Sequence, residues 1–563
     1  EVQTLSTGSR FQDKLYEKTM MHNYYQANVY ATYAHTWNEK HNFKAMAGFN
    51  WETKYLKDVS ATGYNLLSET LMDLNLVGQD ADGNERMEVG GGQNEYALMG
   101  FFGRLNYDYK GKYLVEVSGR YDGTSRFKRG HRWGFFPSFS LGWRISEEPF
   151  FEGIREKFNN FKIRYSYGQL GNQNVGYYDY IRKISIGNQN YLFGGDKPTT
   201  ATISAPVASN LSWETSIHNN LGVDMSFLNN RLAFSADFYI RDTKDMLTSG
   251  VALPSVYGAD SPKMNSADLR TKGYELSLSW RDEFQLLRRP FTYSVTVTFN
   301  DYVTDITKYD NPDRTFAKSY YEGMRWGEIW GYRIGGLFAT DAEAAGYAVD
   351  QTAVNNRINA AAGSERGLHA GDLKFLDLDG DIGKNTVDDP GDREIIGNSQ
   401  PRFHYGTTLS MSWAGIDFSI FFQGIGRRHW YPKANTIAFW GPYARPYASW
   451  IPKDFHEMYW SEENPDAYFP RPRGYVALSG TNRELTAVND RYMQNIRYCR
   501  LKNLTIGYTL PKKWTRKVLI ENLRVYFTGE NLATWSPIHS DYIDEMRTYP
   551  WQKTYMFGVD VTF

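Results

Sequence analysis

Short runs in which apolar and polar side chains alternate recur along the whole chain. In one of them, Phe234, Ala236, Phe238 and Ile240 are interleaved with Ser235, Asp237, Tyr239 and Arg241. Successive side chains of a strand point to opposite faces, so this period of two predicts a strand with one apolar and one polar face. Helical stripes are scarce. The chain is therefore expected to be all-β.

The alternation predicts about fifteen strands, with boundaries good to a few residues. They lie near 24–37, 42–54, 96–109, 112–124, 134–146, 160–170, 216–227, 231–243, 271–281, 291–302, 402–413, 415–425, 496–510, 522–533 and 553–563. Short turns are expected at Asn38–His41, Lys110–Gly111, Leu228–Asn230 and Ala414–Gly415, and modest links at 146–159, 281–290 and 511–521. Long loops fall between them, at about 55–95, 171–215, 244–270, 303–401, 426–495 and 534–552. The short stretch 125–133 is the exception on the long-loop side.

Two features favour a transmembrane β-barrel over a soluble β protein. Outer-membrane barrels alternate short periplasmic turns with long outer loops. They also carry girdles of aromatic residues at the lipid–water boundary, and the candidates here cap the apolar faces of strands: Tyr107, Tyr109, Trp143, Trp280, Trp413 and Tyr508. The alternative is a large soluble sandwich or propeller with the aromatics in its core, but no blade period is visible. The lipid bilayer of an outer membrane is thus the expected surroundings.

Composition excludes several other classes of protein. The 563 residues carry a net charge of −1, which argues against nucleic acid binding by bulk electrostatics. Aromatic residues make up 16% of the chain, too many for general disorder. Cys499 is the single cysteine, so no disulfide framework and no cysteine-based zinc cluster can form within the chain. No apolar window is long enough for a membrane-spanning helix.

The C-terminal strand carries a separate signal. Its apolar face consists of Tyr555, Phe557, Val559, Val561 and the last residue, Phe563. An amphipathic final strand that ends in Phe resembles the signal that the barrel-assembly machinery recognises. The strand is therefore expected to end in the periplasm.

The number of strands bears on the extent of the barrel. If the last of fifteen alternating strands runs inward, the first does too, and residues 1–23 lie on the outer side. Single-chain bacterial barrels have an even number of strands. We therefore expect residues 1–563 to be the C-terminal part of a larger barrel that begins within an outer loop, whether the rest is cleaved or merely absent here.

Specific sequence strings resemble the SusC/RagA family of TonB-linked outer-membrane transporters. They occur in the order found in that family and span nearly the whole chain. The most informative are Gly119–Phe127, His131–Ser138, Leu141–Ile145, Ile163–Gly168, Gly171–Gln173, Trp213–Thr215, Phe227–Leu232, Arg241–Leu247, Ile396–Asn398, Phe421–Gly424, Arg500–Tyr508 and Gly529–Leu532.

The resemblance implies a barrel of about 22 strands with an N-terminal plug, so that about seven strands and the plug would lie outside this chain. It also implies a SusD-like surface lipoprotein as a hinged lid. Coupling to the TonB complex would pass through the missing N-terminal part of the same barrel.

One acidic segment has the spacing of a calcium loop. Asp377, Asp379, Asp381 and Asp388 place oxygens at loop positions 1, 3, 5 and 12. Ile382 stands where a calcium loop, and the family, have Gly, which weakens the turn that aims the ligands. The alternative is an acidic Asx-turn loop exposed to water. No cofactor is required, and a structural Ca²⁺ is the one candidate.

The loop at 426–495 is rich in aromatic residues. Flat rings stack on sugars and grip peptide side chains, so substrate or lid contact is expected for Trp430, Tyr431, Trp440, Tyr443, Tyr447 and Trp450. The alternative, which does not exclude the first, is a self-packed loop with a small core of its own.

The leading hypothesis is active import of bulky nutrients, either oligosaccharides or oligopeptides, with a SusD-like lid. A siderophore or cobalamin receptor shares the expected fold, and a passive porin or a barrel-anchored adhesion or assembly protein is a further alternative. The ten histidines are scattered, with neither a metalloprotease motif nor a nucleophile elbow, so the sequence does not indicate an enzyme.

Overall fold

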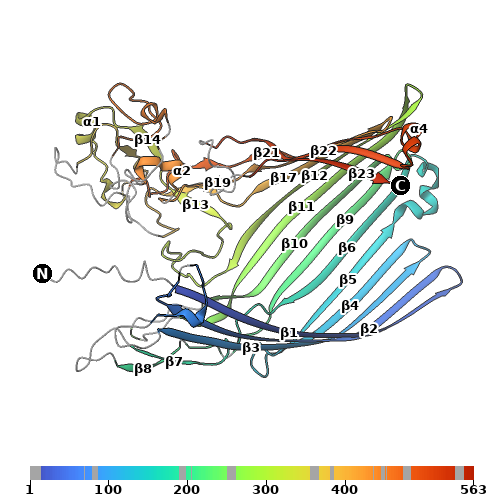
Figure 1. Cartoon of the computed structure of the whole chain (residues 1–563), viewed down its shortest axis with the longest axis horizontal. Coiled ribbons are helices and arrows are strands. Elements are labelled where there is room, and N and C mark those ends of the chain that lie inside the picture. Colours follow the sequence, from blue (N-terminus) through green and yellow to red (C-terminus); the bar gives the residue numbers. More distant parts are fainter. Residues whose placement is uncertain are drawn as a thin grey trace. The chain divides into compact units, whose positions relative to one another are not determined.

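A computed structural model gives the fold (Figure 1). It describes residues 14–563 except 69, 79–85, 189–197, 205, 209, 250–255, 257–260, 355–366, 379, 381–385, 435, 445–450, 452, 473–483 and 539–550. Most of the described chain is β-strand, as the alternating pattern predicts. Within the described residues, no helix is both long enough and apolar enough to cross a membrane.

Fifteen strands form one antiparallel sheet in which chain neighbours pair in order. The strands are β1 (Lys14–Trp37), β2 (His41–Tyr64), β3 (Met87–Tyr109), β4 (Tyr113–Thr124), β5 (Trp133–Arg144), β6 (Phe158–Asn172), β9 (Glu214–Phe227), β10 (Leu232–Ser249), β11 (Lys263–Leu286), β12 (Arg289–Lys308), β17 (Arg402–Trp413), β18 (Ile416–Arg427), β21 (Tyr498–Thr509), β22 (Asn522–Trp535) and β23 (Thr554–Thr562). All fifteen predicted strands are therefore confirmed. Strands β1 and β23 stand at the two ends of the hydrogen-bonded order.

The short turns lie where the sequence predicts them. Lys110 and Gly111 both have positive φ, at 53° and 64°, and so do Ala414 and Gly415, at 54° and 90°. Two central residues with positive φ make a type I′ turn, whose twist matches that of the flanking strands. A further turn of this kind at Leu287 and Arg288 replaces the longer link expected at 281–290, because β11 continues to Leu286.

Several strands extend further than predicted, mostly at the long-loop end. Strand β1 begins at Lys14 rather than near 24, and β11 begins at Lys263 rather than near 271. The backbone pairing continues there, as in the register from Lys14↔Tyr64 to Trp37↔His41, while the side chains no longer alternate cleanly. The period of two marks only the part of a strand whose two faces meet different surroundings.

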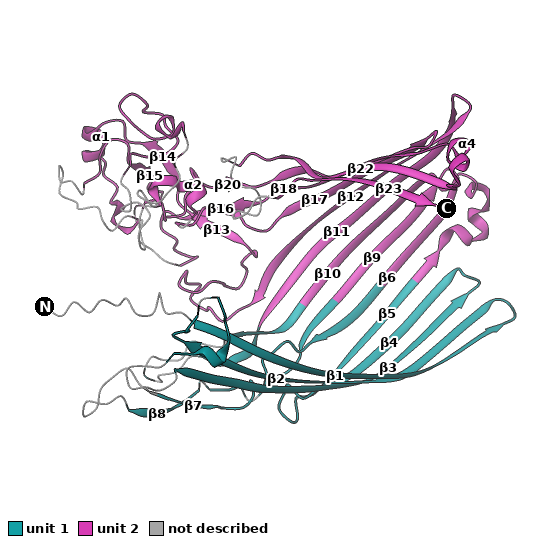
Figure 2. Ribbon diagram, viewed as in Figure 1, with its two compact units in different colours: residues 1–141, 166–217, 243–266 teal, residues 142–165, 218–242, 267–563 magenta. Residues whose placement is uncertain are grey.

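The chain divides into two compact units, coloured separately in Figure 2. Unit 1 contains residues 1–141, 166–217 and 243–266. Besides its strands it has the small hairpin β7 (Ile184–Asn188) with β8 (Thr199–Ile203) and the short helix η1 (Leu74–Leu76). Its buried core contains Phe127, Phe136, Val175, Leu211 and Trp213.

Unit 2 contains residues 142–165, 218–242 and 267–563. Its loops form three two-stranded sheets, β13 (Glu328–Gly331) with β16 (Glu394–Asn398), β14 (Ile334–Leu337) with β15 (Leu373–Phe375), and β19 (His429–Trp430) with β20 (Gln494–Asn495). Its described helices are short: η2 (Ile145–Glu147), η3 (Pro149–Ile154), α1 (Asp341–Ala345), η5 (Gln351–Ala353), α2 (Ile437–Trp440), η6 (Gly441–Tyr443), η7 (Phe455–Glu457), α4 (Lys512–Thr515) and η8 (Arg516–Val518).

Candidate functional site: the outer loop module and the polar wall

Two long loops of unit 2 fold together into one body, which we call the loop module. It consists of the described parts of 303–401 and 426–495. Its core combines Leu373 and Phe375 of the first loop with aromatic residues of the second, and each of these core side chains is at most 9% exposed: Trp430, Phe439, Trp440, Tyr443, Phe455, Phe469 and Tyr492. A loop with its own apolar core can hold a fixed shape outside the sheet.

Trp440 is the centre of this core. Its side chain is fully buried, and its ring lies 4.8 Å from that of Phe439 and 5.2 Å from that of Tyr492, both edge-on. Its indole N–H donates to the carbonyl oxygens of Pro432 and Lys433, at 3.2 and 3.1 Å. These hydrogen bonds offset the cost of removing the indole N–H from water.

The other predicted contact residues fall into two groups. Trp430 and Tyr443 are buried in the same core, and the Tyr431 hydroxyl donates to the Leu485 carbonyl at 2.8 Å. Burial raises the pKa of both tyrosines. Tyr447 and Trp450 lie outside the described residues. The self-packed loop is therefore confirmed for four of the six, and contact of these rings with substrate or lid stays a prediction that would require the module to open.

Asn489 joins the two loops at a buried point. The backbone N–H of Tyr332 donates to the Val488 carbonyl at 2.8 Å, and that of Asp490 donates to the Tyr332 carbonyl at 3.1 Å. The Asn489 side chain, fully buried, donates to the Tyr431 hydroxyl at 2.9 Å and accepts the N–H of Tyr492 at 3.1 Å. Its hydrogen-bonding groups are thus satisfied inside the module.

Arg333 adds an ionic connection between the same two loops. Its guanidinium pairs with Glu394 of the first loop and lies 3.2 Å from the Asp490 carboxylate of the second. The two carboxylates raise the pKa of Arg333. Asp490 also accepts the backbone N–H of Ile334 at 3.0 Å.

The strands that carry the first loop are joined at its base. Arg402, the first residue of β17, makes two hydrogen bonds of 2.6 and 2.5 Å with the Asp301 carboxylate on β12. The backbone N–H of Phe403 adds a third at 3.1 Å. Asp301 is only 4% exposed, so this forked pair is largely removed from solvent.

The acidic segment is only partly visible. Asp377 accepts the N–H of Gly380, three residues further on, at 2.5 Å, and Asp388 pairs with Arg314 at 2.5 Å. Asp379 and Asp381 lie outside the described residues. Among the residues that the structure describes, no group of three or more acidic, His or Cys side chains is arranged to hold a metal. Calcium binding therefore stays a prediction.

The girdle residues mostly stand at the short-turn ends of strands. Tyr107 and Tyr109 end β3, Trp413 ends β17, and the Trp413 indole N–H donates to the Leu286 carbonyl at 3.1 Å. Trp143 and Tyr508 are one residue from the ends of β5 and β21. Trp280 does not cap its strand, because β11 continues for six more residues beyond it. Contact of these rings with lipid stays a prediction.

The C-terminal residues lie on β23 and just after it. Tyr555, Phe557, Val559 and Val561 alternate along the strand and are 41–83% exposed, and Phe563 is 89% exposed. The Phe557 ring packs 5.2 Å from Phe527 of β22. These side chains are accessible, and their role as an assembly signal stays a prediction.

The polar face of the sheet carries a charged network that the sequence pattern alone does not reveal. Arg164 on β6 reaches Asp224 on β9 at 3.0 Å and Asp237 on β10 at 2.6 Å, and Asn220 donates to Asp237 at 2.8 Å. Gly222 makes this possible, because a Cβ there would lie 2.4 Å from the guanidinium carbon. We call these residues the polar wall.

A second network has the same plan on strands β18 to β23. Arg524 lies 2.7 Å from Asp417 and 3.1 Å from Asp560, and Gly507 on the strand between leaves room for the guanidinium. The signal in the sequence was the presence of Arg and Asp on the polar faces of several strands, such as Asp237 and Arg524. Which residues meet depends on the register of strands two apart, and a single sequence does not supply that register.

Comparison with known proteins shows the family of the chain. Residues 3–366 match the family described as TonB dependent receptor-like, beta-barrel. The chain belongs to this family. It is a family of transporters and receptors, and the predicted SusC/RagA resemblance is confirmed by relatives of that type.

Two curated relatives illustrate the match. TonB-dependent receptor P3 of Formosa agariphila is 28% identical over 510 residues, covering 88% of this chain and 46% of the relative. TonB-dependent receptor SusC of Bacteroides thetaiotaomicron is 28% identical over 490 residues, covering 83% of this chain and 44% of the relative. The chain thus spans about half the length of these relatives.

Among solved structures, the fold is similar to that of the RagAB peptide importer in its "open-open" state. The TM-score is 0.75 at 21% identity, over 98% of this chain and 56% of that chain. At this identity the similarity establishes the fold. The predicted all-β architecture of an antiparallel barrel sheet is therefore confirmed.

Proposed function

We propose that this chain is the C-terminal barrel part of an outer-membrane transporter that imports bulky nutrients, oligosaccharides or oligopeptides, in a TonB-dependent way. The observation that carries the proposal is the pairing of a fifteen-stranded antiparallel sheet with a folded loop module on its long-loop side. A sheet with one apolar and one polar face suits a lipid-embedded wall around an aqueous lumen. A compact module above it offers a surface for substrate and for a lid.

The extent of the barrel is part of the proposal. Fifteen strands are an odd number, and the matched relatives are about twice as long as this chain. Further strands and a plug would belong to the remaining N-terminal part, through which the TonB complex would act. Mass spectrometry of the intact and the denatured native protein gives the length of the full chain and any cleavage. A native protein that consists of these 563 residues alone would refute the larger barrel.

Uptake by whole cells tests the transport function. Cells that carry the native full-length protein are given labelled oligosaccharides or oligopeptides, with and without a protonophore. Active import predicts accumulation that the protonophore abolishes, because TonB draws on the inner-membrane proton gradient. Uptake that persists without the gradient would indicate a porin instead, and uptake of iron chelates alone would indicate a siderophore receptor.

A SusD-like lipoprotein is the proposed partner. Copurification from native membranes in several detergents, followed by identification of the bound lipoprotein and any trapped ligand, tests this partner. Failure to recover a lipoprotein under any of these conditions would remove the lid from the proposal. It would leave the transport function to be judged by uptake.

A structural Ca²⁺ at the acidic segment is a lesser part of the proposal. The hydrogen bond from the Gly380 N–H to the Asp377 carboxylate supports it, because it turns the backbone around the first acidic residue of the spacing. Calcium titration of the intact receptor by calorimetry tests it. The absence of heat up to millimolar calcium would refute it.

A further inference from the structure

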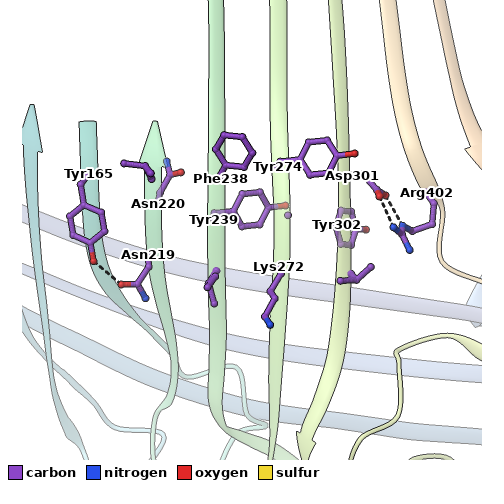
Figure 3. A pocket seen from close by; sticks show the side chains of 14 residues that line it. Tyr165, Asn219, Asn220, Phe238, Tyr239, Lys272, Tyr274, Asp301, Tyr302 and Arg402 are labelled. Atoms are coloured by element: carbon purple, nitrogen blue, oxygen red, sulfur yellow. Dashed lines mark hydrogen bonds and ion pairs between the residues drawn. The ribbon is translucent and has the colours of Figure 1, made fainter. Parts of the chain in front are cut away.

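A groove of about 470 Å³ crosses strands β9, β10, β11 and β12 within unit 2 (Figure 3). We call it the membrane-face groove. The residues that line it include Leu221, Phe238, Ile240, Lys272, Tyr274 and Val303.

The alternation of side chains assigns the groove to the apolar face of the sheet. Phe238 and Ile240 are 53% and 41% exposed, and Leu221 is 48% exposed. Asp237, one residue along β10, points the other way into the polar wall and pairs with Arg164. The space over the opposite face is already filled, because the Tyr239 hydroxyl lies 2.5 Å from the Cβ position of Gly273. The groove therefore faces lipid in a membrane-embedded barrel.

Its height along the strands corresponds to the outer leaflet. Lys272 is eight residues from Trp280 on β11, which is about 27 Å along a strand. At the strand tilt of outer-membrane barrels this is roughly 20 Å of height, close to the roughly 25 Å apolar band of such a barrel. The next outward residue on this face, Arg270, pairs with Asp242 at 2.6 Å. A charged pair at that position marks the level at which water and headgroups begin.

The charge of the groove is positive at its outer side. The Asp301 carboxylate at one end is neutralised by the two hydrogen bonds from Arg402. Lys272 is exposed, and no carboxylate of the described residues lies within ion-pair distance of its ammonium. At the other end the Tyr165 hydroxyl donates to the Asn219 oxygen at 2.9 Å, which orients the Asn219 amide as a second polar donor. Figure 3 shows Lys272 between these two ends.

We propose that the membrane-face groove binds a phosphorylated glycolipid of the outer leaflet. One acyl chain would lie against Leu221, Phe238 and Ile240, where contact with the exposed rings and methyl groups replaces looser packing in bulk lipid. The phosphate would pair with the Lys272 ammonium, and the Asn219 amide would donate to a sugar or phosphate oxygen. The site requires both an acyl chain and an anionic headgroup, so it should bind this lipid in preference to lipids of the same leaflet that carry no net charge.

The test uses the full-length transporter, purified in mild detergent, stripped of lipid and titrated while bound lipid is counted by native mass spectrometry. Three probes are compared: lipid A, lipid A without its phosphates, and phosphatidylethanolamine. The proposal predicts that lipid A binds most tightly. Lys272→Gln should weaken lipid A binding about fivefold, the effect of one basic residue at a membrane surface, and should leave dephosphorylated lipid A unchanged.

Two further variants complete the design. Ile240→Trp places a bulky indole ring in the groove and should weaken binding of both forms of lipid A. Lys57→Gln is the matched control, because Lys57 is an exposed lysine near the outer end of β2, on the strand face of Phe49 and Trp51. Heat-modifiable migration on gels verifies that each variant is folded. Equal effects of Lys272→Gln and Lys57→Gln would overturn the proposal, as would equal binding of the three probes.

Discussion

The aromatic residues of this chain have different roles, which depend on whether their side chains are buried or exposed. Trp440 and Tyr492 are fully buried in the loop module, whereas Tyr555 and Phe557 stand exposed on the last strand. Phe127 and Trp213, which belong to the strings shared with the SusC/RagA family, pack edge-on at 5.7 Å in the core of unit 1. Those shared strings thus include scaffold residues of the fold.

Replacement of Trp440 measures what the module core contributes. Trp440→Ala removes a fully buried ring and leaves two carbonyl groups without their donor, so the module should lose about 3–5 kcal/mol of stability. Limited proteolysis and hydrogen exchange of the loops in the intact receptor report this loss. Trp514→Ala, which removes a ring that is 58% exposed on α4, is the control. Equal protection of the loops in both variants would contradict the assigned core.

His429 predicts a pH dependence of the same module. Its Nδ1 accepts the backbone N–H of Asn398 at 3.0 Å, which requires that nitrogen to be unprotonated. Burial lowers the pKa of His429, and the nearby Arg427 lowers it further. In the unfolded loop a histidine has a pKa of about 6.5. Just below that pH the unfolded loop therefore binds a proton at His429, while the folded loop does not.

The sign follows from this difference in proton binding. Where the unfolded state holds more protons, stability rises with pH, so the His429 contribution is complete above about pH 6.5 and is lost as the pH falls towards the folded pKa. Hydrogen exchange of β16 and β19 between about pH 7.5 and pH 5.5 measures the loss. His429→Gln keeps an acceptor without a proton to titrate and should flatten the profile; an unchanged profile in that variant would assign the effect to another group.

Among elements, the strands could be predicted from the sequence and the loop module could not. A strand in a barrel wall meets lipid on one side and water on the other. Its alternation of apolar and polar residues can therefore be seen in a short stretch of sequence, as for Phe234 to Ile240. Asn489 and Tyr332 meet across more than 150 residues of chain, and nothing local in either loop signals the pairing. The aromatic content of 426–495 did indicate packing, and the structure shows that its partners include Leu373 and Phe375 of the other loop.

The connection between the two loops can be weakened without opening the core. Arg333→Ala leaves Glu394 and Asp490 without their shared cation, and since the Arg333 side chain is 44% exposed the cost should be about 1 kcal/mol or less. A double-mutant cycle with Asp490→Asn, read by hydrogen exchange at β13 and β16, isolates the pair. Arg325→Ala is the matched control, because that exposed arginine pairs with Asp305 at the base of the same loop. Full additivity of the Arg333 and Asp490 changes would show that the pair does not couple the loops.

For the whole molecule, the two faces of the sheet have different roles. The polar face carries the ion pairs that join the strands, and the apolar face is exposed to the surroundings. On the polar side, Arg164 connects two aspartates across three strands and Arg524 connects two across four, and the opposite side is lined by exposed apolar residues such as Phe238 and Val561. In the proposed outer-membrane setting, lipid would cover the apolar side of this sheet. Insertion into the membrane would then stabilise the fold alongside the contacts within the chain.

Phe563 tests how that insertion begins. Its ring is 89% exposed and follows the last residue of β23, so its replacement removes no internal packing. Phe563→Ala in the full-length protein should reduce the heat-modifiable, folded receptor in the outer-membrane fraction several-fold at equal synthesis, because the assembly machinery would no longer recognise the strand. Leu519→Ala, at a residue 86% exposed in the link before β22, is the control for loss of an exposed apolar side chain. If both variants reach the membrane in equal amounts, β23 is only a wall strand, and recognition must depend on another part of the chain.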